Sequence, residues 1–534
     1  MKRYGVRLIA LILAAALLTG CAGFGDYQRL KDLYFGSTTN FSHMEYVRPD
    51  PDDFLEAQSR CLTLAAEGKD LNALTDAIWD MYDEYDHFYT MYTLADIYYC
   101  RDMSDLYWQP EHAWCQEKSH EVEAGLDQLL YALAASPLRK ELESDNLFGA
   151  GYFDSYQGES VRDEKMTALM EEESALSDQY NALVMELPGE EDPGYEAAAM
   201  EIVEIYARLI ALRQQQAALA GYDDYISLAN DLYYSRDFSR AQVESYLAGI
   251  REHLVPIYRQ VYTMDSEDLG CYQAQKEQVV GYLSKAARNM GGVVAEAFQV
   301  MESASLYDLD QGENRYPASY EVYLLDYELP YVFLSPEGTN YDALAFAHEF
   351  GHFCNDYASY GSVLNTDCAE VLSQGMEYLS LCYAGKEADL TRLKMADSLY
   401  AYVEQAAYTE FEYAAYSLSA EELTAENLVA LYEEVTAQYG FDVTGYDGTE
   451  LVDITHFFTY PGYVVSYIIS NDAAMQIYRM ELEKPGAGLK LYEKLLASNA
   501  WTLDEFLKEA DLQSPFAPGR VEEAARIFRE TFGG

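Results

Sequence analysis

The 534-residue sequence is poor in basic side chains, with 35 lysines and arginines against 91 aspartates and glutamates. The net charge of −56 argues against nucleic acid as a partner, because its phosphates would be repelled. Low-complexity blocks and short-period repeats are also missing. Half of the residues are hydrophobic, which is enough for a large folded body and, by length alone, for several domains.

Long apolar runs are scarce as well. The run at Leu8–Leu18 follows three basic residues and is too short to cross a bilayer, so it fits the core of a signal peptide. It ends in "LTGC", which resembles the lipobox of bacterial lipoproteins, with Cys21 as the lipid-modified residue. An ordinary secretory signal that ends in cysteine is the alternative. We expect a signal peptide over 1–20, a tether over 21–45, and an exported protein anchored to a bacterial membrane by lipid on Cys21, outside the cytoplasm.

Cysteine is infrequent, and seven residues remain after Cys21. An exported protein can form disulfides, and Cys61, Cys100 and Cys115 are close enough in sequence for one bridge. Their connectivity does not follow from the sequence. Two further cysteines flank the candidate site described below, but their spacing fits no cysteine zinc pattern.

Helical periodicity dominates the chain. Residues 164–187 and 195–220 each carry an apolar stripe and are joined by "LPGEEDPG", which predicts an antiparallel helical hairpin. Ser239 and Gln242 predict a capping box, and residues 46–135 also indicate helices. One region differs: "SYEVYLLDYELPYVFLSPEGT" at 319–339 predicts strands near 320–325 and 330–335. We therefore predict a mainly α fold with a small β-sheet.

Histidine is rare too, yet two of the eight residues stand four apart in "AHEFGH", an H-E-x-x-H motif. On a helix His348 and His352 would share one face and could bind one ion, with Glu349 beside them to accept a proton. A helix surface with two solvated histidines is the alternative. The flanking residues are apolar, which favours a buried helix whose histidines need partners. Thr339 or Asn340 could cap this helix, with Asp342 in its first turn.

A third metal ligand is expected downstream, because catalytic zinc usually has three protein ligands. The segment "NTDCAEVLSQGMEYLSL" at 365–381 predicts a helix capped by Asn365 or Thr366, with Glu370 in its first turn. Glu370 is the natural ligand, and Glu377 lies on the same face and could orient a ligand. The sequence therefore predicts one zinc ion per chain.

These motifs together resemble the zinc peptidases of the M3 family, which includes thimet oligopeptidase and bacterial oligoendopeptidase F. "AHEFGH", "AEVLSQGMEY", the strand "LPYVFLSPEGT" and "LYEKLLASNAWTLDEFLKEADL" carry the likeness, which covers about residues 140–530. It implies an almost wholly helical, two-lobed body around a deep substrate channel with zinc at its floor. We expect the catalytic region to span 151–534, and by continuity we assign residues 46–150 to an N-terminal helical lobe.

The resemblance assigns roles to individual residues. It implies that His348, His352 and Glu370 bind zinc and that Glu349 is the general base. In "THFFTYPGYVVSYIIS", 455–470, it implies that His456, Tyr463 and Tyr467 donate hydrogen bonds to substrate and intermediate, with Tyr460 as a further candidate. The two tyrosines would lie one turn apart on a helix. The interval between His352 and Glu370 is shorter than in the family, and the glycines and tyrosines after His456 are not in the usual register.

The expected activity is that of a metalloendopeptidase that hydrolyses short unstructured peptides by attack of a zinc-bound water with Glu349 as the base. The strand at 330–335 could pair with an extended peptide. Two alternatives remain: a lipid-anchored peptide-binding protein for uptake, and a peptidase-like scaffold without activity. Stoichiometric zinc would separate the first from an enzyme, and turnover would separate the second.

Overall fold

The computed structural model describes residues 39–144, 148–149, 151–156, 164–189, 192–362, 364–386, 389–445 and 447–533. The predicted signal peptide, Cys21 and the first part of the predicted tether, up to residue 38, lie outside these ranges. Phe41 and Met44, at the end of that segment, are buried. Among the described residues, no helix combines the length and apolarity needed to span a membrane.

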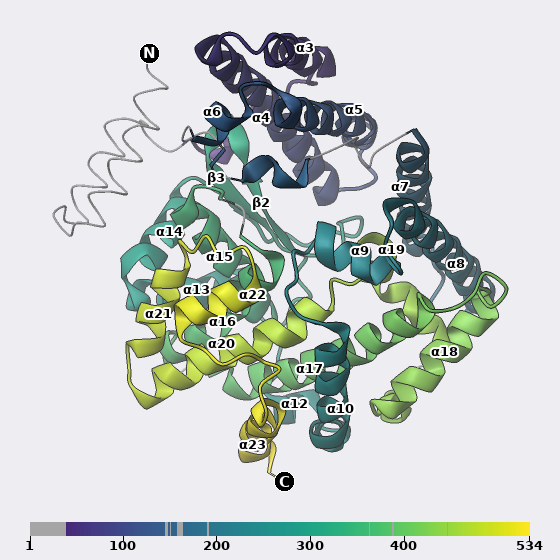
Figure 1. The fold of residues 1–534 in the computed structure, drawn as a ribbon. Coiled ribbons are helices and arrows are strands. Elements are labelled where there is room, and N and C mark those ends of the chain that lie inside the picture. The colour runs from purple at the N-terminus through teal and green to yellow at the C-terminus, as the bar shows by residue number, and fades with distance from the viewer. Residues whose placement is uncertain are drawn as a thin grey trace.

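Four helices form the N-terminal part, drawn in purple and blue at the top of Figure 1. Their bounds are Pro51–Glu67 (α3), Leu71–Arg101 (α4), Trp108–Ala135 (α5) and Arg139–Ser144 (α6). Asp50 and Asp70 cap α3 and α4 by accepting backbone N–H groups, as expected for aspartate at this position. Between them Gly68 has φ +61°, and a Cβ there would lie 2.6 Å from the Pro137 ring, so only glycine fits this turn.

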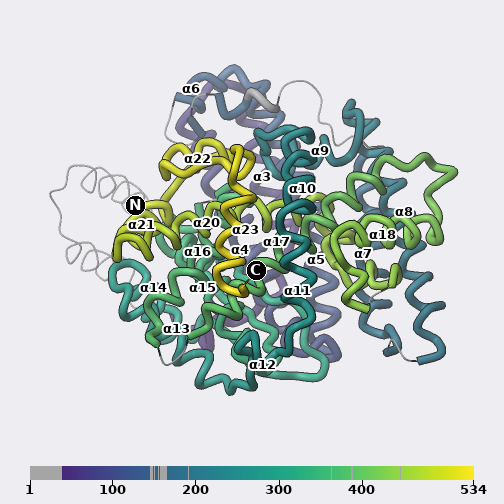
Figure 2. Tube along the Cα trace, turned by 90° about the horizontal axis from the view of Figure 1, so that it is seen from below, coloured from purple at the N-terminus to yellow at the C-terminus, as the bar shows by residue number. Residues whose placement is uncertain are grey.

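A helical hairpin follows, as predicted, and further helices lead to the sheet. The bounds are Glu164–Met185 (α7), Tyr195–Ala220 (α8), Tyr225–Leu232 (α9), Arg240–His253 (α10), Val255–Tyr262 (α11), Ser266–Leu269 (α12), Lys276–Met290 (α13) and Gly292–Ser303 (α14). The capping box of Ser239 and Gln242 at the start of α10 is confirmed. Both views place α7 and α8 with α18 on one side of the molecule and α13 and α14 on the other (Figures 1 and 2).

The sheet has three strands in the order β1-β3-β2, namely Tyr307–Asp308 (β1), Tyr320–Leu324 (β2) and Leu329–Phe333 (β3). Strands β2 and β3 lie close to their predicted positions and pair antiparallel, while β1 pairs parallel with Val332 and Phe333. At these two residues β3 is therefore occupied on both sides. The expectation that a peptide pairs with this strand is therefore wrong at Val332 and Phe333, and in the described sheet both β1 and β2 are edge strands.

The second half of the chain is again helical. The helices are Asp342–Ser359 (α15), Thr366–Tyr383 (α16), Thr391–Ala415 (α17), Ala425–Gln438 (α18), Thr455–Thr459 (α19), Val465–Glu483 (α20), Ala487–Leu495 (α21), Leu503–Ala510 (α22) and Arg520–Phe532 (α23). Short 3₁₀ turns lie at Phe41–His43, Tyr152–Ser155, Leu325–Tyr327, Phe441–Val443 and Gly448–Asp453. The mainly helical fold with one small sheet is as predicted.

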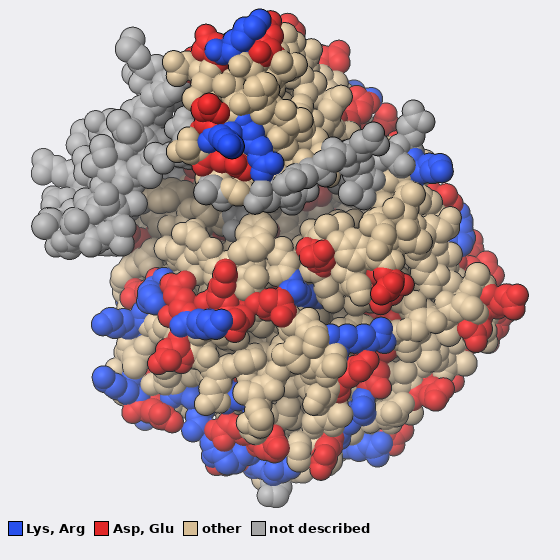
Figure 3. Space-filling model, viewed as in Figure 1, with Lys and Arg blue, Asp and Glu red and all other residues tan. Residues whose placement is uncertain are grey.

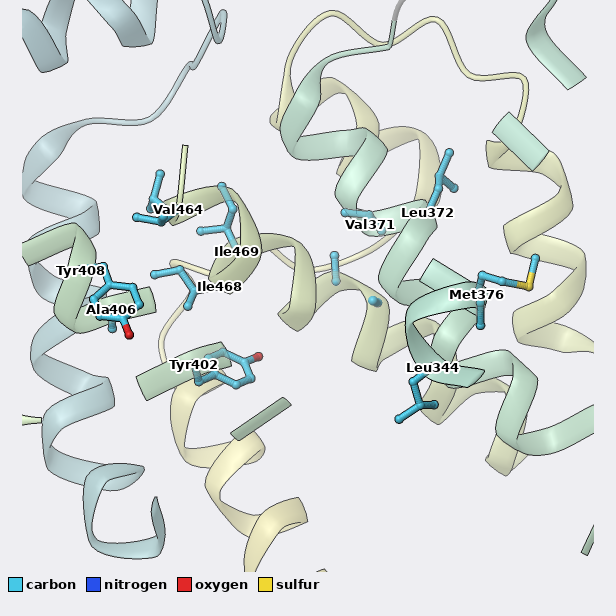
Figure 4. Packing of buried hydrophobic residues seen from close by; sticks show 14 of the residues in the cluster. Leu344, Val371, Leu372, Met376, Tyr402, Ala406, Tyr408, Val464, Ile468 and Ile469 are labelled. Atoms are coloured by element: carbon cyan, nitrogen blue, oxygen red, sulfur yellow. The ribbon is translucent and has the colours of Figure 1, made fainter. Parts of the chain in front are cut away.

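Helix α16 packs between α15 and α20 at the centre of the main hydrophobic core. Figure 4 shows side chains from this region, among them Leu344 of α15, Met376 of α16 and Ile468 of α20. Helices α15 and α16 approach closely at Gly351, where a Cβ would lie 2.6 Å from Cα of Ser373 and 2.8 Å from the carbonyl oxygen of Leu372. A residue without a side chain at this crossing lets the two backbones approach closely.

The long helix α4 belongs to two hydrophobic cores. Its first part, from Leu74 to Phe88, contributes to a small core with α3, α5 and α6. Its last turns, from Met91 to Cys100, contribute to the main core with most of the remaining chain. One helix thus fixes the N-terminal helices to the body that carries the sheet and α15.

The surface carries charged side chains of both signs, and the described cysteines are unpaired. Figure 3 shows acidic and basic side chains interspersed over one face of the molecule. The seven described cysteines are all free, so Cys61, Cys100 and Cys115 form no bridge. Five of the seven are buried, including Cys354 and Cys368 beside the candidate site.

Candidate active site

Two histidines and a glutamate meet where α15 crosses α16. His348 and His352 lie one turn apart on α15, and Nε2 of each faces the carboxylate of Glu370 on α16, at 3.4 Å and 3.9 Å. One ligand atom from each residue lies within 4.8 Å of the others, and within the described chain this is the one such group of three or more potential ligands. Tetrahedral zinc with bonds of about 2.0–2.2 Å separates its ligands by roughly 3.3–3.6 Å. The two measured separations are close to that range, and the donor set suits zinc.

Hydrogen bonds orient two of these three side chains, His348 and Glu370. Nδ1 of His348 lies 2.9 Å from Oε1 of Glu377, so the predicted orienting contact is present. The hydroxyl groups of Ser373 and Tyr463 donate to the two oxygens of Glu370, at 3.0 Å and 2.6 Å. Outer contacts of this kind fix the orientation of metal ligands.

The starts of the two helices differ in part from expectation. Asn365 caps α16 as predicted, but the helix begins at Thr366, so Glu370 lies in its second turn. Neither Thr339 nor Asn340 caps α15. Instead the carboxylate of Asp342 accepts backbone N–H groups from residues 337–339, which fixes the turn between β3 and the helix.

Burial changes the protonation of the groups around this cluster. It raises the pKa of Glu349 to about 7, with further raising by the charges of Glu370 and Glu377 against a lowering effect of His348. It lowers the pKa of His352 to about 4, which favours the neutral imidazole that binds metals. Burial alone would raise the pKa of Glu370, but hydrogen bonding and charge from His348 lower it to about 2. The carboxylate at the cluster is thus ionised, and Glu349 suits proton transfer near neutral pH.

The predicted histidine and tyrosines lie together beside the metal cluster. We call His456 and Tyr467 with their segment the tyrosine wall, and His348, His352 and Glu370 the metal wall. His456 is on the short helix α19, and its Nε2 lies 3.2 Å from the hydroxyl of Tyr467. The rings of Tyr463 and Tyr467 have centroids 5.3 Å apart. Tyr460, the further candidate, is 62% exposed. The expectation that Tyr463 lies on a helix is wrong, because Gly462 has φ +79° and α20 starts only at Val465.

A buried arginine that no sequence motif indicated, Arg236, connects the tyrosine segment to helix α16. Arg236 donates to the carbonyl oxygen of Gly462 at 2.7 Å and to the hydroxyl of Ser466 at 2.9 Å. On its other side it pairs with Asp367, in the first turn of α16, at 3.2 Å. The side chains of Arg236 and Asp367 are each 1% exposed, so water does not weaken the pair. The tyrosine segment is thereby joined to the helix that carries Glu370.

A second buried arginine supports the helix of His456. Arg213, on α8, is fully buried and donates to the carbonyl oxygens of Phe457 and Phe458 at 2.8 Å and 2.6 Å. Its Nε lies 2.6 Å from the carboxylate of Glu173 on α7. Both helices of the predicted hairpin, α7 and α8, therefore help to position α19 and with it His456.

The site opens into a cavity of about 690 Å³. His348, Glu349, His456 and Tyr467 line one part of it, and residues of α17 line another. The lining holds five carboxylates and one basic side chain, Lys394. A cavity of this size can take several residues of an extended peptide.

Comparison with known proteins supports the same family as the motifs. Residues 41–159 match the family model of the Peptidase M3 N-terminal domain. No curated protein sequence matches the chain significantly.

Solved structures share the fold over nearly the whole chain. PZ peptidase A with an inhibitor has a TM-score of 0.80 at 19% identity, covering 92% of this chain and 99% of that chain. A protein assigned as oligoendopeptidase F has a TM-score of 0.79 at 20% identity, covering 92% and 98%. Another from Bacillus anthracis str. Ames has a TM-score of 0.76 at 19% identity, covering 93% and 98%. At these identities the likeness establishes the fold.

Proposed function

We propose that this protein is a zinc-dependent endopeptidase that hydrolyses peptide bonds of short unstructured peptides. The observation that supports this most is the convergence of His348, His352 and Glu370 beside a cavity that His348 and the buried Glu349 line. The match to the M3 N-terminal domain and the shared fold point the same way.

We infer that His348, His352 and Glu370 would hold one zinc ion per chain. A bound zinc ion would supply Lewis acidity, which activates water for attack and polarises the scissile carbonyl. Two neutral imidazoles and one carboxylate form a ligand set typical of catalytic zinc, which leaves a position open for water or substrate.

Glu349 would act as the general base and acid. It would take a proton from the attacking water and deliver it to the leaving amine. Its pKa of about 7 suits both steps, because the group can be deprotonated before attack and protonated afterwards. The position of Glu349 fits this role, because it lies between the two histidines on α15 and lines the cavity.

His456 and Tyr467 would stabilise the oxyanion that develops on the substrate carbonyl. Their side chains lie 3.2 Å apart on the cavity wall, and both can donate hydrogen bonds. One such donor is worth on the order of 3 kcal/mol in the transition state. Tyr463 has a different position, because its hydroxyl bonds the carboxylate of Glu370, and we assign it to ligand orientation as well as to substrate contact.

The two alternative functions explain the site less well. A peptide carrier has no need for a buried carboxylate beside two histidines, because burying it costs free energy. A decayed enzyme would be expected to have lost the base or a ligand, and Glu349 and all three ligand residues are intact. We therefore place catalysis first and test it directly.

The deciding experiment uses the protein from residue 22 onward and a mixed library of unstructured peptides. Internal cleavage that stops with a chelator and returns with added zinc, read by mass spectrometry, would support the proposal. One zinc bound per chain without any cleavage would favour the inactive scaffold. If the protein neither binds zinc nor cleaves any peptide, the proposed metal site itself is wrong.

We further propose that the chain is exported and anchored through lipid on Cys21, on the strength of the "LTGC" segment. The test is incorporation of labelled fatty acid in a bacterial host, with Cys21→Ala as the matched control. Label in the parent protein that is lost in the variant would support the anchor. Equal label, or none in either protein, would contradict it.

A further inference from the structure

A lysine on α17 is buried against the orienting glutamate of the candidate metal site. Lys394 is 2% exposed, and its Nζ lies 2.7 Å from Oε2 of Glu377. It also lies 2.8 Å from the carboxylate of Asp397 and 5.0 Å from the ring centre of Tyr378. A buried ammonium group with two carboxylate partners and an aromatic face is a fixed feature rather than a mobile side chain.

The contacts of Glu377 divide between two neighbours. Oε2 accepts from Lys394, while Oε1 lies 2.9 Å from Nδ1 of His348. An ammonium group can only donate, and an ionised carboxylate can only accept, so the proton of this second bond belongs to Nδ1 of the histidine. Nε2 of His348, which faces Glu370 and His352, is then the nitrogen that would supply its lone pair to a bound metal ion.

We propose that Lys394 is a positioning residue for the metal site: by holding the carboxylate of Glu377 in place, it fixes the ring orientation and the tautomer of His348 that coordinates zinc through Nε2. This inference rests on the proposed function, since it concerns the affinity for the metal that the function requires. Outer contacts of this kind typically change metal affinity by about ten- to a hundredfold when removed.

A different role for Lys394, binding the C-terminal carboxylate of a substrate, fits the surroundings poorly. Its ammonium group already has two carboxylate partners and is almost without solvent exposure. Glu349 and Glu404 line the same cavity, so a peptide carboxylate would also meet negative charge.

Asp397 supports Lys394 from the far side. Its Oδ1 accepts a hydrogen bond from the hydroxyl of Tyr341 at 2.9 Å, and its Oδ2 bonds Lys394. The line of contacts thus runs from Tyr341 through Asp397, Lys394 and Glu377 to His348. Tyr341 is the remote end of this line and offers a control.

The experiment measures zinc affinity by competition with a chelator, without any substrate, and measures the melting of each zinc-free protein by circular dichroism. The variants are Lys394→Met, Lys394→Arg, Glu377→Gln and the double variant Glu377→Gln/Lys394→Met. Tyr341→Phe is the matched control, because it removes one buried hydroxyl from the same cluster and leaves the bond between Lys394 and Glu377.

We expect Lys394→Met to weaken zinc binding by about ten- to a hundredfold, Lys394→Arg to restore part of that loss, and Tyr341→Phe, at the remote end of the line, to have a much smaller effect than Lys394→Met. We expect the double variant to bind zinc as Glu377→Gln does, because Lys394 acts through Glu377. If Lys394→Met does not fold, the zinc affinities of Glu377→Gln and of the double variant can still be compared, because the double variant removes both charges together. Equal affinities would support the inference.

Three results would overturn the inference. Unchanged zinc affinity in a folded Lys394→Met protein would exclude the role while leaving the peptidase proposal in place. An equal further loss in the Glu377→Gln background would mean that Lys394 acts by another route. A parent protein that binds no zinc would overturn both this inference and the proposed function.

Discussion

The two walls of the candidate site are built in different ways. The metal wall, His348, His352 and Glu370, comes from two long helices that pack directly on each other. The tyrosine wall, with His456 and Tyr467, comes from one five-residue helix, a turn and the start of another helix.

The difference lies in what fixes the backbone. At the metal wall, helix hydrogen bonds and the close crossing at Gly351 determine where the ligands lie. At the tyrosine wall, Arg213 and Arg236 satisfy carbonyl oxygens that no regular element pairs. The first wall is therefore set by local sequence and the second by contacts between distant segments.

The largest effect is expected for Glu349→Gln. The amide keeps the shape of the side chain but cannot accept a proton, so turnover should fall by about 10²–10⁴-fold while zinc stays bound. Steady-state cleavage of a fluorogenic peptide and zinc content per chain measure the two quantities. Cleavage at the parent rate would exclude Glu349 as the base.

Arg236→Met should break the link between the walls. It leaves Asp367 buried without its ion pair, so we expect the free energy of unfolding to fall by about 3–5 kcal/mol. Chemical denaturation of the zinc-free protein measures this loss.

The double variant Arg236→Met/Asp367→Asn sharpens that result. Without the unpaired charge, most of the stability should return, whereas kcat should stay low because Gly462 and Ser466 have lost their anchor. Full recovery of kcat in the double variant would show that Arg236 has no part in placing the tyrosines.

Tyr467→Phe tests the tyrosine wall alone. Loss of one donor to the oxyanion should lower kcat by about 10²–10³-fold with zinc affinity unchanged. Tyr460→Phe is the matched control, because that side chain is exposed and should tolerate the change. Similar kcat values for the two variants would remove Tyr467 from the mechanism.

The smallest effect is expected at the helix crossing. Gly351→Ala places a methyl group within 3 Å of the α16 backbone, which should cost about 1–3 kcal/mol in stability despite a better helix propensity. The control is Gly281→Ala in α13, where nothing lies within 4 Å and alanine should stabilise by up to about 1 kcal/mol. Thermal unfolding of both variants gives the comparison, and equal shifts would mean that the crossing is not tight.

The same contrast explains how much could be predicted from the sequence. His348, His352, Glu370 and Glu377 follow from helical spacing, and the structure brings them together as expected. The helical hairpin, the capping box and strands β2 and β3 also follow from local patterns.

The errors come from places where a distant or competing contact decides. Asp342 accepts the backbone N–H groups of residues 337–339 in the turn before α15, and neither Thr339 nor Asn340 caps the helix. Gly462 delays the start of α20, so Tyr463 reaches Glu370 from a turn. Arg236 and Lys394 carried no motif, because the partner of Arg236 lies 131 residues away and Lys394 resembles any lysine on an amphipathic helix.

The double membership of α4 has a consequence for modularity. The matched M3 N-terminal domain spans residues 41–159, yet Met91, Leu94 and Ile97 within it pack into the main core. Cut out at its family borders, this segment would expose an apolar face to water and would be prone to aggregate. The unit that sequence comparison delimits is thus not one that could be exchanged between proteins by itself.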